Sequence, residues 1–332
     1  MATIKEIAEM AEVSTATVSR VLNYDESLNA SEATRKKIFA IAQELEYVTT
    51  RERRSKKQIC QVCIVKGYSE QEELDDPYYF SIRLSIEKSL REENIEYIVI
   101  SKDRLFDERL NKVDGILAVG SFTTEEIKNF KDMNGNIVFV DSNPQDEAFD
   151  SVVINMGKVV KKVLDYLISL GHKEIGYIGG EDYLIGENIH LPDYRESWYR
   201  KYMSEFGFLN EEFIRVGRFT PISGYELMKD ILDTGKYPSA FFIANDSMAI
   251  GAYKAIMEKG LSIPEDISIV GCNDIPTAQF IVPALTTIKI YINFMGETAV
   301  DLLVERIKYE RKISKIIVIP TELILRDSCK KL

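Results

Sequence analysis

The sequence predicts an α/β protein with a small N-terminal head of three helices and a larger body of two parallel-sheet lobes. In the head, apolar residues recur at helical spacing between residues 4 and 45. From residue 58 onward, apolar runs of strand length alternate with amphipathic helical stretches, which is typical of parallel sheets covered by helices on both faces. The chain has 332 residues, and the 275 that follow residue 57 are too many for one such unit.

Composition excludes several classes of protein. The chain is 45% hydrophobic and 29% charged, which argues against a disordered or fibrous protein. No stretch approaches the ~18 uninterrupted apolar residues of a membrane span, so no membrane partner is expected. The N-terminus, MATIKEIAEM, has no apolar core of the kind that secretory signals carry. Four cysteines do not make a disulfide framework, and a reducing cytoplasmic location is expected.

The charge is distributed unevenly along the chain. The total of −11 argues against a nucleic-acid partner only if the charge is evenly spread. Residues 1–57 carry ten Lys or Arg against nine Asp or Glu, whereas residues 58–332 carry 32 against 44. Residues 51–57 hold five cations and one anion. The chain therefore consists of an acidic body, a near-neutral head and a basic neck between them.

The head divides into three short helices. The first is expected over residues 4–11, and Ser14 is of the type that caps a helix N-terminus after a short break. The second is expected over residues 15–23, and the third begins near Ser31 and runs to about residue 47. Three helices with a tight first turn form a helix-turn-helix module. The alternative is a small three-helix bundle that binds nothing.

The second helix would carry the contacts to DNA. In such modules the N-terminal residues of this helix reach base edges in the major groove. Thr15 and Ala16 suit thymine methyl groups, and Arg20 is long enough for a bidentate contact to guanine, worth roughly 1–3 kcal/mol of discrimination. Thr17, Ser19 and Asn23 are candidates for hydrogen bonds to phosphates or base edges.

The identities in the head carry a resemblance as well as a pattern. The run TIKEIAEMA, then VSTATVSRVLN, TRKKI and LEY, is similar to the head of the LacI/GalR family of bacterial transcription regulators over nearly all of residues 3–47. The resemblance implies binding to double-stranded operator DNA. Glu12 departs from the family, which usually has Gly or Asn there, and a positive φ at this position would disfavour Glu relative to glycine.

The neck departs from the family more strongly. The resemblance implies a hinge helix that forms on DNA and wedges a leucine into the minor groove. Lys56 stands where that leucine is expected, which leaves an electrostatic neck or a flexible charged linker as the alternatives. The candidate DNA-binding residues are thus Thr3, Ser14, Thr15, Ala16, Thr17, Ser19, Arg20, Asn23, Arg51, Arg54 and Lys56.

The body contains the predicted sheets. Strands are expected at 59–65, 97–100, 115–119, 137–140, 175–178, 240–243 and 267–270. Helices are expected near 79–93, 123–131, 156–170, 194–206, 223–233, 246–259 and 293–310. Ligands of such sheets bind beyond the carboxyl ends of the strands, which for two lobes is the cleft between them.

The second half of the body extends the resemblance to the whole chain. The runs NDSMAIG, GLSIPEDIS and PALTTI are similar to the effector core of the same family, which resembles periplasmic sugar-binding proteins of type I. Residues 76–79 (DPYY) and 273–278 (NDIPTA) are more similar to its galactose and β-galactosidase operon repressors. The implied domains are the head (1–47), the hinge (48–57) and an effector and dimerisation domain (58–332). Its first lobe spans about 58–156 and 291–318, and its second about 157–290 and 319–332.

The resemblance also implies effector contacts. Arg195 matches an arginine that clamps a hydroxyl or carboxylate, and Phe219 matches an aromatic stacked on the effector ring. Asn245 matches a polar contact, and either Asn273 or Asp274 could supply another. Three further candidates are Asp141, which follows a predicted strand, and Tyr79 and Phe80 on the wall of the first lobe. For the aromatic residues, core packing is the alternative.

Other motifs are discounted. Cys60 and Cys63 form a single CxxC inside a predicted strand, and the acidic run 69–76 is more typical of a solvated loop than of a metal site. Nucleophile elbows, P-loops and zinc signatures are absent, so neither an enzyme nor a cofactor or metal is expected.

The sequence therefore predicts a homodimeric DNA-binding repressor that responds to a small sugar, with galactose or a galactoside favoured. Two heads are needed because family operators are near-palindromic. The alternatives are a sugar receptor with a vestigial head, an enzyme on a doubly wound fold, and a regulator that needs a phosphoprotein corepressor.

Overall fold

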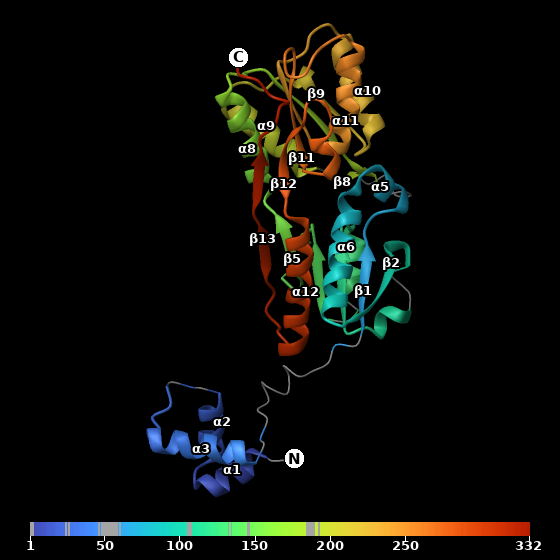
Figure 1. Ribbon diagram of the computed structural model, residues 1–332. Coiled ribbons are helices and arrows are strands. Elements are labelled where there is room, and N and C mark those ends of the chain that lie inside the picture. Colours follow the sequence, from blue (N-terminus) through green and yellow to red (C-terminus); the bar gives the residue numbers. More distant parts are fainter. Residues whose placement is uncertain are drawn as a thin grey trace. The chain divides into compact units, whose positions relative to one another are not determined.

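The computed structural model describes residues 3–332 except 24, 26, 46, 48–58, 60, 105–107, 132, 134, 145–146, 184–189 and 192. The chain splits into two compact units, one of residues 1–58 with 305–311 and one of residues 59–304 with 312–332 (Figure 1). Among the described residues, no helix combines the length and the apolar composition that crossing a membrane requires.

The head is built from α1 (Ile4–Ala11), α2 (Thr15–Leu22) and α3 (Glu32–Glu44). Each helix begins at a hydroxyl-bearing residue, Thr3, Ser14 or Ser31, whose side chain accepts a backbone N–H of the first turn. Between α1 and α2, Glu12 adopts the left-handed conformation with φ 58° and ψ 42°, the backbone region that disfavours Glu relative to glycine. Fully buried apolar side chains from all three helices form the core of the head: Ile7, Val18, Val21 and Ile38.

The first lobe contains an all-parallel sheet in the order β13-β5-β4-β3-β1-β2. Its strands are β1 (Gln61–Lys66), β2 (Glu96–Ser101), β3 (Gly115–Val119), β4 (Ile137–Val140), β5 (Asp150–Ile154) and β13 (Ile316–Ile319). The helices of this lobe are α5 (Glu70–Asp75), α6 (Pro77–Glu92), α7 (Thr124–Lys131) and α12 (Ile292–Tyr309). Two short 3-10 turns, η1 (Lys102–Arg104) and η2 (Glu108–Asn111), precede β3. Helix α6 packs against β2 and β3.

The second lobe repeats the plan in the order β14-β12-β11-β10-β6-β9, with only β14 antiparallel to its neighbour in the described chain. Its strands are β6 (Ile175–Gly180), β9 (Ile214–Gly217), β10 (Ala240–Ile243), β11 (Ser268–Asn273), β12 (Thr286–Ile290) and β14 (Thr321–Ile324). Its helices are α8 (Met156–Ser169), α9 (Tyr194–Glu205), α10 (Pro221–Asp233) and α11 (Asp246–Glu258). The turns η3 (Glu211–Phe213) and η4 (Pro276–Gln279) and the short pair β7 (Asp182–Tyr183) and β8 (His190–Leu191) complete it.

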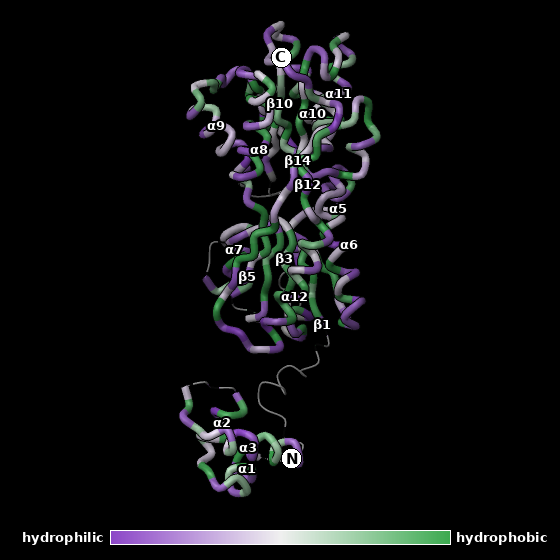
Figure 2. The backbone as a smooth tube through the Cα atoms, turned by 60° about the vertical axis from the view of Figure 1, so that its left-hand side comes forward, coloured by the Kyte–Doolittle hydropathy of each residue, from purple (hydrophilic) through white to green (hydrophobic). Residues whose placement is uncertain are grey.

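The chain passes between the two sheets three times. It leaves the first sheet after β5, returns by way of α12 to β13, and crosses again to β14. The inner strands β1 and β3 are largely green in Figure 2, and nearly all of their residues are buried, as is typical of parallel strands covered by helices on both faces. Polar side chains that can meet a ligand are therefore expected at strand ends and helix starts.

The fold class is confirmed, whereas single elements differ. All seven predicted strands and all seven predicted helices of the body are present, with shifts of a few residues at their ends. The strands β5, β9, β12, β13 and β14 were not predicted. The expected solvated loop at residues 69–76 was wrong, because Ser69 and Glu72 form a capping box that starts the short helix α5.

Candidate functional site

The candidate DNA-reading surface lies on helix α2. Thr15, Ala16, Arg20 and Asn23 are exposed, and the intervening Val18 is buried in the head core. Helix α2 therefore has one face in the head core and one face in solvent, as a helix that enters the major groove of DNA requires. The remaining predicted residues of the described head, Thr3, Ser14, Thr17 and Ser19, are exposed or half-buried.

Several of these side chains are already used by the head itself. The Ser14 hydroxyl accepts the Thr17 N–H at 3.0 Å and lies 2.8 Å from the Thr17 hydroxyl. Thr3 and Glu6 form a reciprocal capping box at the start of α1. These contacts give Ser14 and Thr3 a local role in starting helices, whereas Thr15 and Ala16 are exposed at the start of α2 and remain candidates for contacts to DNA.

Arg20 is held in place by residues that follow α2. Its Nε donates to Asp25 Oδ2 at 2.6 Å, and its guanidinium also donates to the Ser27 hydroxyl at 2.8 Å. Asp25 in turn accepts the Ser27 N–H and hydroxyl. The hydrogen bond from Arg20 is the largest of the effects that lower the pKa of the exposed Asp25 carboxyl to about 2. The contacts of Arg20 with Asp25 and Ser27 were not predicted, although both residues follow closely after the predicted second helix. The predicted neck contacts Arg51, Arg54 and Lys56 lie outside the described residues.

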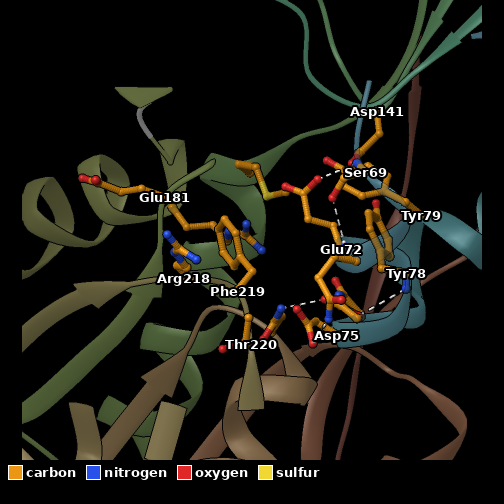
Figure 3. A pocket seen from close by; sticks show the side chains of 16 residues that line it. Ser69, Glu72, Asp75, Tyr78, Tyr79, Asp141, Glu181, Arg218, Phe219 and Thr220 are labelled. Atoms are coloured by element: carbon orange, nitrogen blue, oxygen red, sulfur yellow. Dashed lines mark hydrogen bonds between the residues drawn. The ribbon is translucent and has the colours of Figure 1, made fainter. Parts of the chain in front are cut away.

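A second site is a cavity of about 250 Å³ between the two lobes. In Figure 3 the first-lobe side chains Tyr78 and Tyr79 lie on one side, and Arg218 and Phe219 of the second lobe lie on the other. The lining residues are Ser69, Gln71, Glu72, Asp75, Asp76, Tyr78, Tyr79, Asp141, Met156, Glu181, Arg195, Arg218, Phe219, Thr220, Asn245 and Asn273. Six of the eight predicted effector residues are therefore brought together, namely Tyr79, Asp141, Arg195, Phe219, Asn245 and Asn273.

The other two predicted residues lie outside the lining. Phe80 is 38% exposed, and its ring packs under the guanidinium of Arg83, 5.1 Å from the ring centroid. Successive residues of a helix are about 100° apart, so Tyr79 can face the cavity while Phe80 does not. Asp274 accepts a hydrogen bond from Arg326 at 2.6 Å, so the neighbouring Asn273 is the one of the pair that lines the cavity.

Arg195 is fixed from three sides. Its Nε lies 2.9 Å from Asp193 Oδ1, its Nη1 donates to the carbonyl of Ala244 at 2.7 Å, and its guanidinium lies 4.8 Å from the centroid of Phe219. A Cβ added to Gly180 would overlap the Phe219 ring, so the backbone at residue 180 packs closely on that ring. Phe219 therefore acts largely as a platform for Arg195, which presents a preorganised cation to the cavity.

Asn245 joins the two lobes. Its Oδ1 caps α11 by accepting the Met248 N–H at 2.8 Å, and its Nδ2 donates to Asp76 Oδ2 at 2.6 Å. Asp76 caps α6 by accepting the Tyr78 N–H at 3.2 Å. Burial is the main cause that raises the pKa of Asp76. Asp76 was not among the predicted site residues, although an aspartate directly before Pro77 is a recognisable helix start.

A buried carboxyl supports the second-lobe wall. Asp246 is fully buried, accepts the Thr287 hydroxyl at 2.6 Å and accepts the Ile275 N–H at 2.9 Å. Burial raises its pKa to about 8. These bonds tie α11 to β12 and to the turn after β11, where Asn273 has a positive φ of 114°. The lining position of Asn273 thus depends on a residue outside the lining.

The first-lobe wall combines an aromatic pair with α5. The rings of Tyr68 and Tyr79 stack with centroids 4.8 Å apart. Glu73 of α5 accepts hydrogen bonds from Arg83 at 2.9 and 3.3 Å, and both side chains are mostly buried. This ion pair fixes α5, so that its polar residues Gln71, Glu72 and Asp75 line the cavity. An acidic run without apolar periodicity gave no sign of this role in the sequence.

The cavity is acidic and polar. Five carboxyl groups and two guanidinium groups line it, and within the described residues no cluster of His, Cys, Asp and Glu is arranged to hold a metal ion. Carboxylates, amides and an arginine beside aromatic rings suit a ligand with many hydroxyl groups. Cys63 is buried in β1 and does not line the cavity, and Cys60 lies outside the described residues.

Comparison with known proteins covers both parts of the chain. A model of bacterial regulatory proteins, lacI family, matches residues 3–50, and a model of the periplasmic binding protein-like domain matches residues 164–329. The chain is 38% identical over 332 residues to the HTH-type transcriptional regulator GalR of Streptococcus thermophilus, covering 99% of this chain and 100% of that protein.

Two further similarities cover almost the whole length. The HTH-type transcriptional repressor MelR of Bacillus subtilis (strain 168) is 37% identical over 337 residues, with 99% of this chain and 98% of that protein covered. Among solved structures, a complex of the transcriptional regulator CelR with cellobiose matches with a TM-score of 0.71 at 25% identity, covering 99% of this chain and 100% of the other.

Proposed function

The chain belongs to the lacI family of bacterial regulatory proteins, and from this premise we propose that it represses transcription until an uncharged saccharide occupies the cleft. The observation that carries the proposal is the polar cavity between two lobes in a chain that also has a DNA-reading helix. The relatives compared above are transcriptional regulators, and we propose that this protein likewise acts without catalysis, in the cytoplasm where DNA is found.

On DNA, we place α2 in the major groove with Thr15, Ala16 and Arg20 toward the bases. A single head covers one half-site, so the active form is a homodimer on a near-palindromic operator. The basic residues Arg51, Arg54 and Lys56 of the neck add contacts to phosphates, which contribute affinity without sequence information.

For the effector, the charge of the cavity favours a neutral ligand. A phosphate or carboxylate would meet the five carboxyl groups of Glu72, Asp75, Asp76, Asp141 and Glu181 against two guanidinium groups, and one of these, Arg195, is already paired with Asp193. The similarity of residues 76–79 and 273–278 to galactose and β-galactosidase operon repressors makes galactose or a galactoside the first candidate. Cellobiose, which the structurally similar CelR binds, is the second.

The control would operate through the two lobes. Asp76 and Asn245 belong to different lobes and are hydrogen-bonded to each other. A saccharide that binds between them stabilises one lobe arrangement more than another and so shifts the population that is competent for DNA. A coupling of ~1–3 kcal/mol would change operator affinity about 5–150-fold.

The test combines ligand binding with DNA binding on the full chain. Operator duplexes are first selected from a random-sequence pool, with Arg20→Ala as the control for specific binding. Galactose, lactose, melibiose, cellobiose and galactose 6-phosphate are then titrated. One neutral sugar should lower operator affinity and, at 100 times its Kd, stabilise the protein by about 2.7 kcal/mol. Response to galactose 6-phosphate alone contradicts the neutral effector, and no response to any of the five contradicts sugar control and favours a protein corepressor.

A further inference from the structure

The hydroxyl of Tyr78 is buried at the cavity beside the Asp141 carboxylate, and no group of the described residues lies in hydrogen-bonding geometry to it. Tyr78 stands in the first turn of α6, is 7% exposed, and lines the cavity. Two fully buried tyrosines use their hydroxyls, since Tyr177 donates to Asp193 at 2.9 Å and Tyr199 donates to the carbonyl of Ile175 at 2.6 Å. A buried hydroxyl without a partner is unfavourable, so its presence at a cavity calls for an explanation.

Among the described residues, four buried hydroxyls lack a hydrogen-bond partner, those of Tyr78, Ser142, Ser151 and Tyr253. Of these four residues, only Tyr78 lines the cavity. The ring of Tyr78 is held by its neighbour Tyr79, with centroids 5.2 Å apart, and by the start of α6, where its N–H is bonded to Asp76. The hydroxyl therefore has a fixed position.

The chemistry of this hydroxyl is that of a donor. Burial, together with the nearby Asp141 carboxylate, raises the pKa of Tyr78 well above its usual value, so the proton is retained at every physiological pH. A tyrosine hydroxyl in that state offers one O–H to an acceptor. An uncharged sugar has such acceptors in its hydroxyl, ring and glycosidic oxygens, and none of them adds negative charge next to Asp141 and Asp76.

We propose that the Tyr78 hydroxyl donates a hydrogen bond to an oxygen of the bound saccharide and makes Tyr78 a specificity-determining residue of the first lobe. The inference rests on the proposed function. Arg195 and Asn245 would hold the sugar from the second lobe, and Tyr78 would hold it from the first. A saccharide oxygen placed at Tyr78 would thus contribute to bridging the lobes.

The experiment compares Tyr78→Phe with Tyr253→Phe in the full chain. Each change removes only a buried hydroxyl that has no partner, but Tyr253 of α11 lies outside the cavity lining. Galactose, lactose, melibiose and cellobiose are titrated calorimetrically into each protein, and ligand-free melting is recorded in parallel. For a sugar that the wild type binds, Tyr78→Phe should weaken binding about tenfold (about 1.4 kcal/mol), with melting unchanged or higher. Tyr253→Phe should bind it as the wild type does.

Deoxy analogues of the bound sugar supply a second measurement if Tyr78→Phe folds poorly. In wild-type protein, removing the oxygen that meets Tyr78 should weaken binding about tenfold, and the same removal should have no further effect on Tyr78→Phe. Equal binding by wild type and Tyr78→Phe, or equal losses in both variants, overturns the inference while sugar control stands. Binding of none of the four sugars by the wild type overturns both.

Discussion

Arg20 is oriented by hydrogen bonds within its own head. The hydrogen bonds that it donates to Asp25 and Ser27 hold its guanidinium beside α2, with 45% of the side chain exposed. On DNA, a planar fork can make two parallel bonds to guanine, which a lysine ammonium does not reproduce. The proposed contact of Arg20 with guanine therefore needs the shape of its guanidinium as well as its positive charge.

We predict that Arg20→Lys lowers affinity for the selected operator about tenfold, within the roughly 1–3 kcal/mol of a bidentate base contact. Affinity for a scrambled duplex should stay unchanged, because the charge is kept. Fluorescence anisotropy with both duplexes at one salt concentration measures the two affinities. Equal losses on both duplexes would instead assign Arg20 to a phosphate.

Glu12 makes the turn between α1 and α2 in a conformation that disfavours it. Its φ of 58° is left-handed, and glycine adopts this region without the steric cost of a Cβ. We predict that Glu12→Gly stabilises the head by about 0.5–1 kcal/mol, measured by amide hydrogen exchange of α1 and α2 in the full chain. Asn94→Gly, at φ 56°, is the matched control and should gain less, since asparagine tolerates this region. A loss of protection in Glu12→Gly would show that the carboxylate has an unrecognised role.

At this scale the sequence predicted residue types better than residue positions. Tyr79 and Phe80 were both expected at the cavity, but the phase of α6 is set by Asp76 and Pro77 at its start, and only Tyr79 faces inward. Asp76 and Tyr78 were missed because their importance comes from partners, or an absent partner, that tertiary packing determines.

Helix α11 and strand β12 are joined by the carboxyl of Asp246, whose raised pKa favours the protonated, neutral form. Burial raises the pKa of Asp246 from 3.8 to about 8, so the folded protein binds more protons than the unfolded chain between these values. Its contribution to stability is therefore complete below about pH 4 and is lost as the pH rises toward about 8.

We predict that Asp246→Asn removes this pH dependence. An amide can accept from Ile275 N–H and donate to the Thr287 hydroxyl, so the local bonds can be kept. Between pH 5.5 and 8, urea unfolding should show a fall of more than about 1 kcal/mol for wild type relative to Asp246→Asn. Asp233→Asn is the control, because Lys259 lowers the pKa of that exposed carboxyl and the opposite sign applies. Parallel pH profiles for wild type and Asp246→Asn would contradict a neutral Asp246.

The long amphipathic helices were predictable because their apolar period persists over several turns. Helix α5 was not, since its six residues (EQEELD) are fixed by a capping box and by the Glu73–Arg83 ion pair instead of by an apolar face. Short strands such as β9 and β14, only half-buried over most of their length, likewise lack a continuous apolar run.

At the scale of the whole molecule, the two-lobed plan followed from β–α alternation and chain length. The link between Asp76 and Asn245 did not, because these residues are 169 positions apart and meet only through the three crossings between the sheets. The alternation of strands and helices predicts that site residues lie beyond the carboxyl ends of the strands. Which residues meet across the cleft depends on how the two lobes pack against each other.

The neck is basic and the body is acidic, so we expect the salt dependence of DNA binding to come largely from the neck. The body carries 44 acidic against 32 basic residues, while residues 51–57 hold five cations against one anion. Each phosphate that a cation neutralises makes the slope of log association constant against log salt concentration steeper by about 0.9. The proposed homodimer would contribute two necks, so the neck should account for much of the salt dependence and little of the specificity.

We predict that replacing Arg51, Arg54 and Lys56 together by Gln reduces this slope by up to about 5 per dimer and weakens operator and scrambled DNA alike. Replacing Lys158, Lys161 and Lys254 on the acidic body removes the same charge and should leave the slope unchanged. Binding isotherms between 50 and 200 mM salt, on both duplexes, measure the slopes at about the range where counterion release dominates. A loss confined to the operator would mean that the neck reads sequence, and the lysine at position 56 would then replace the leucine wedge in a sequence-specific contact.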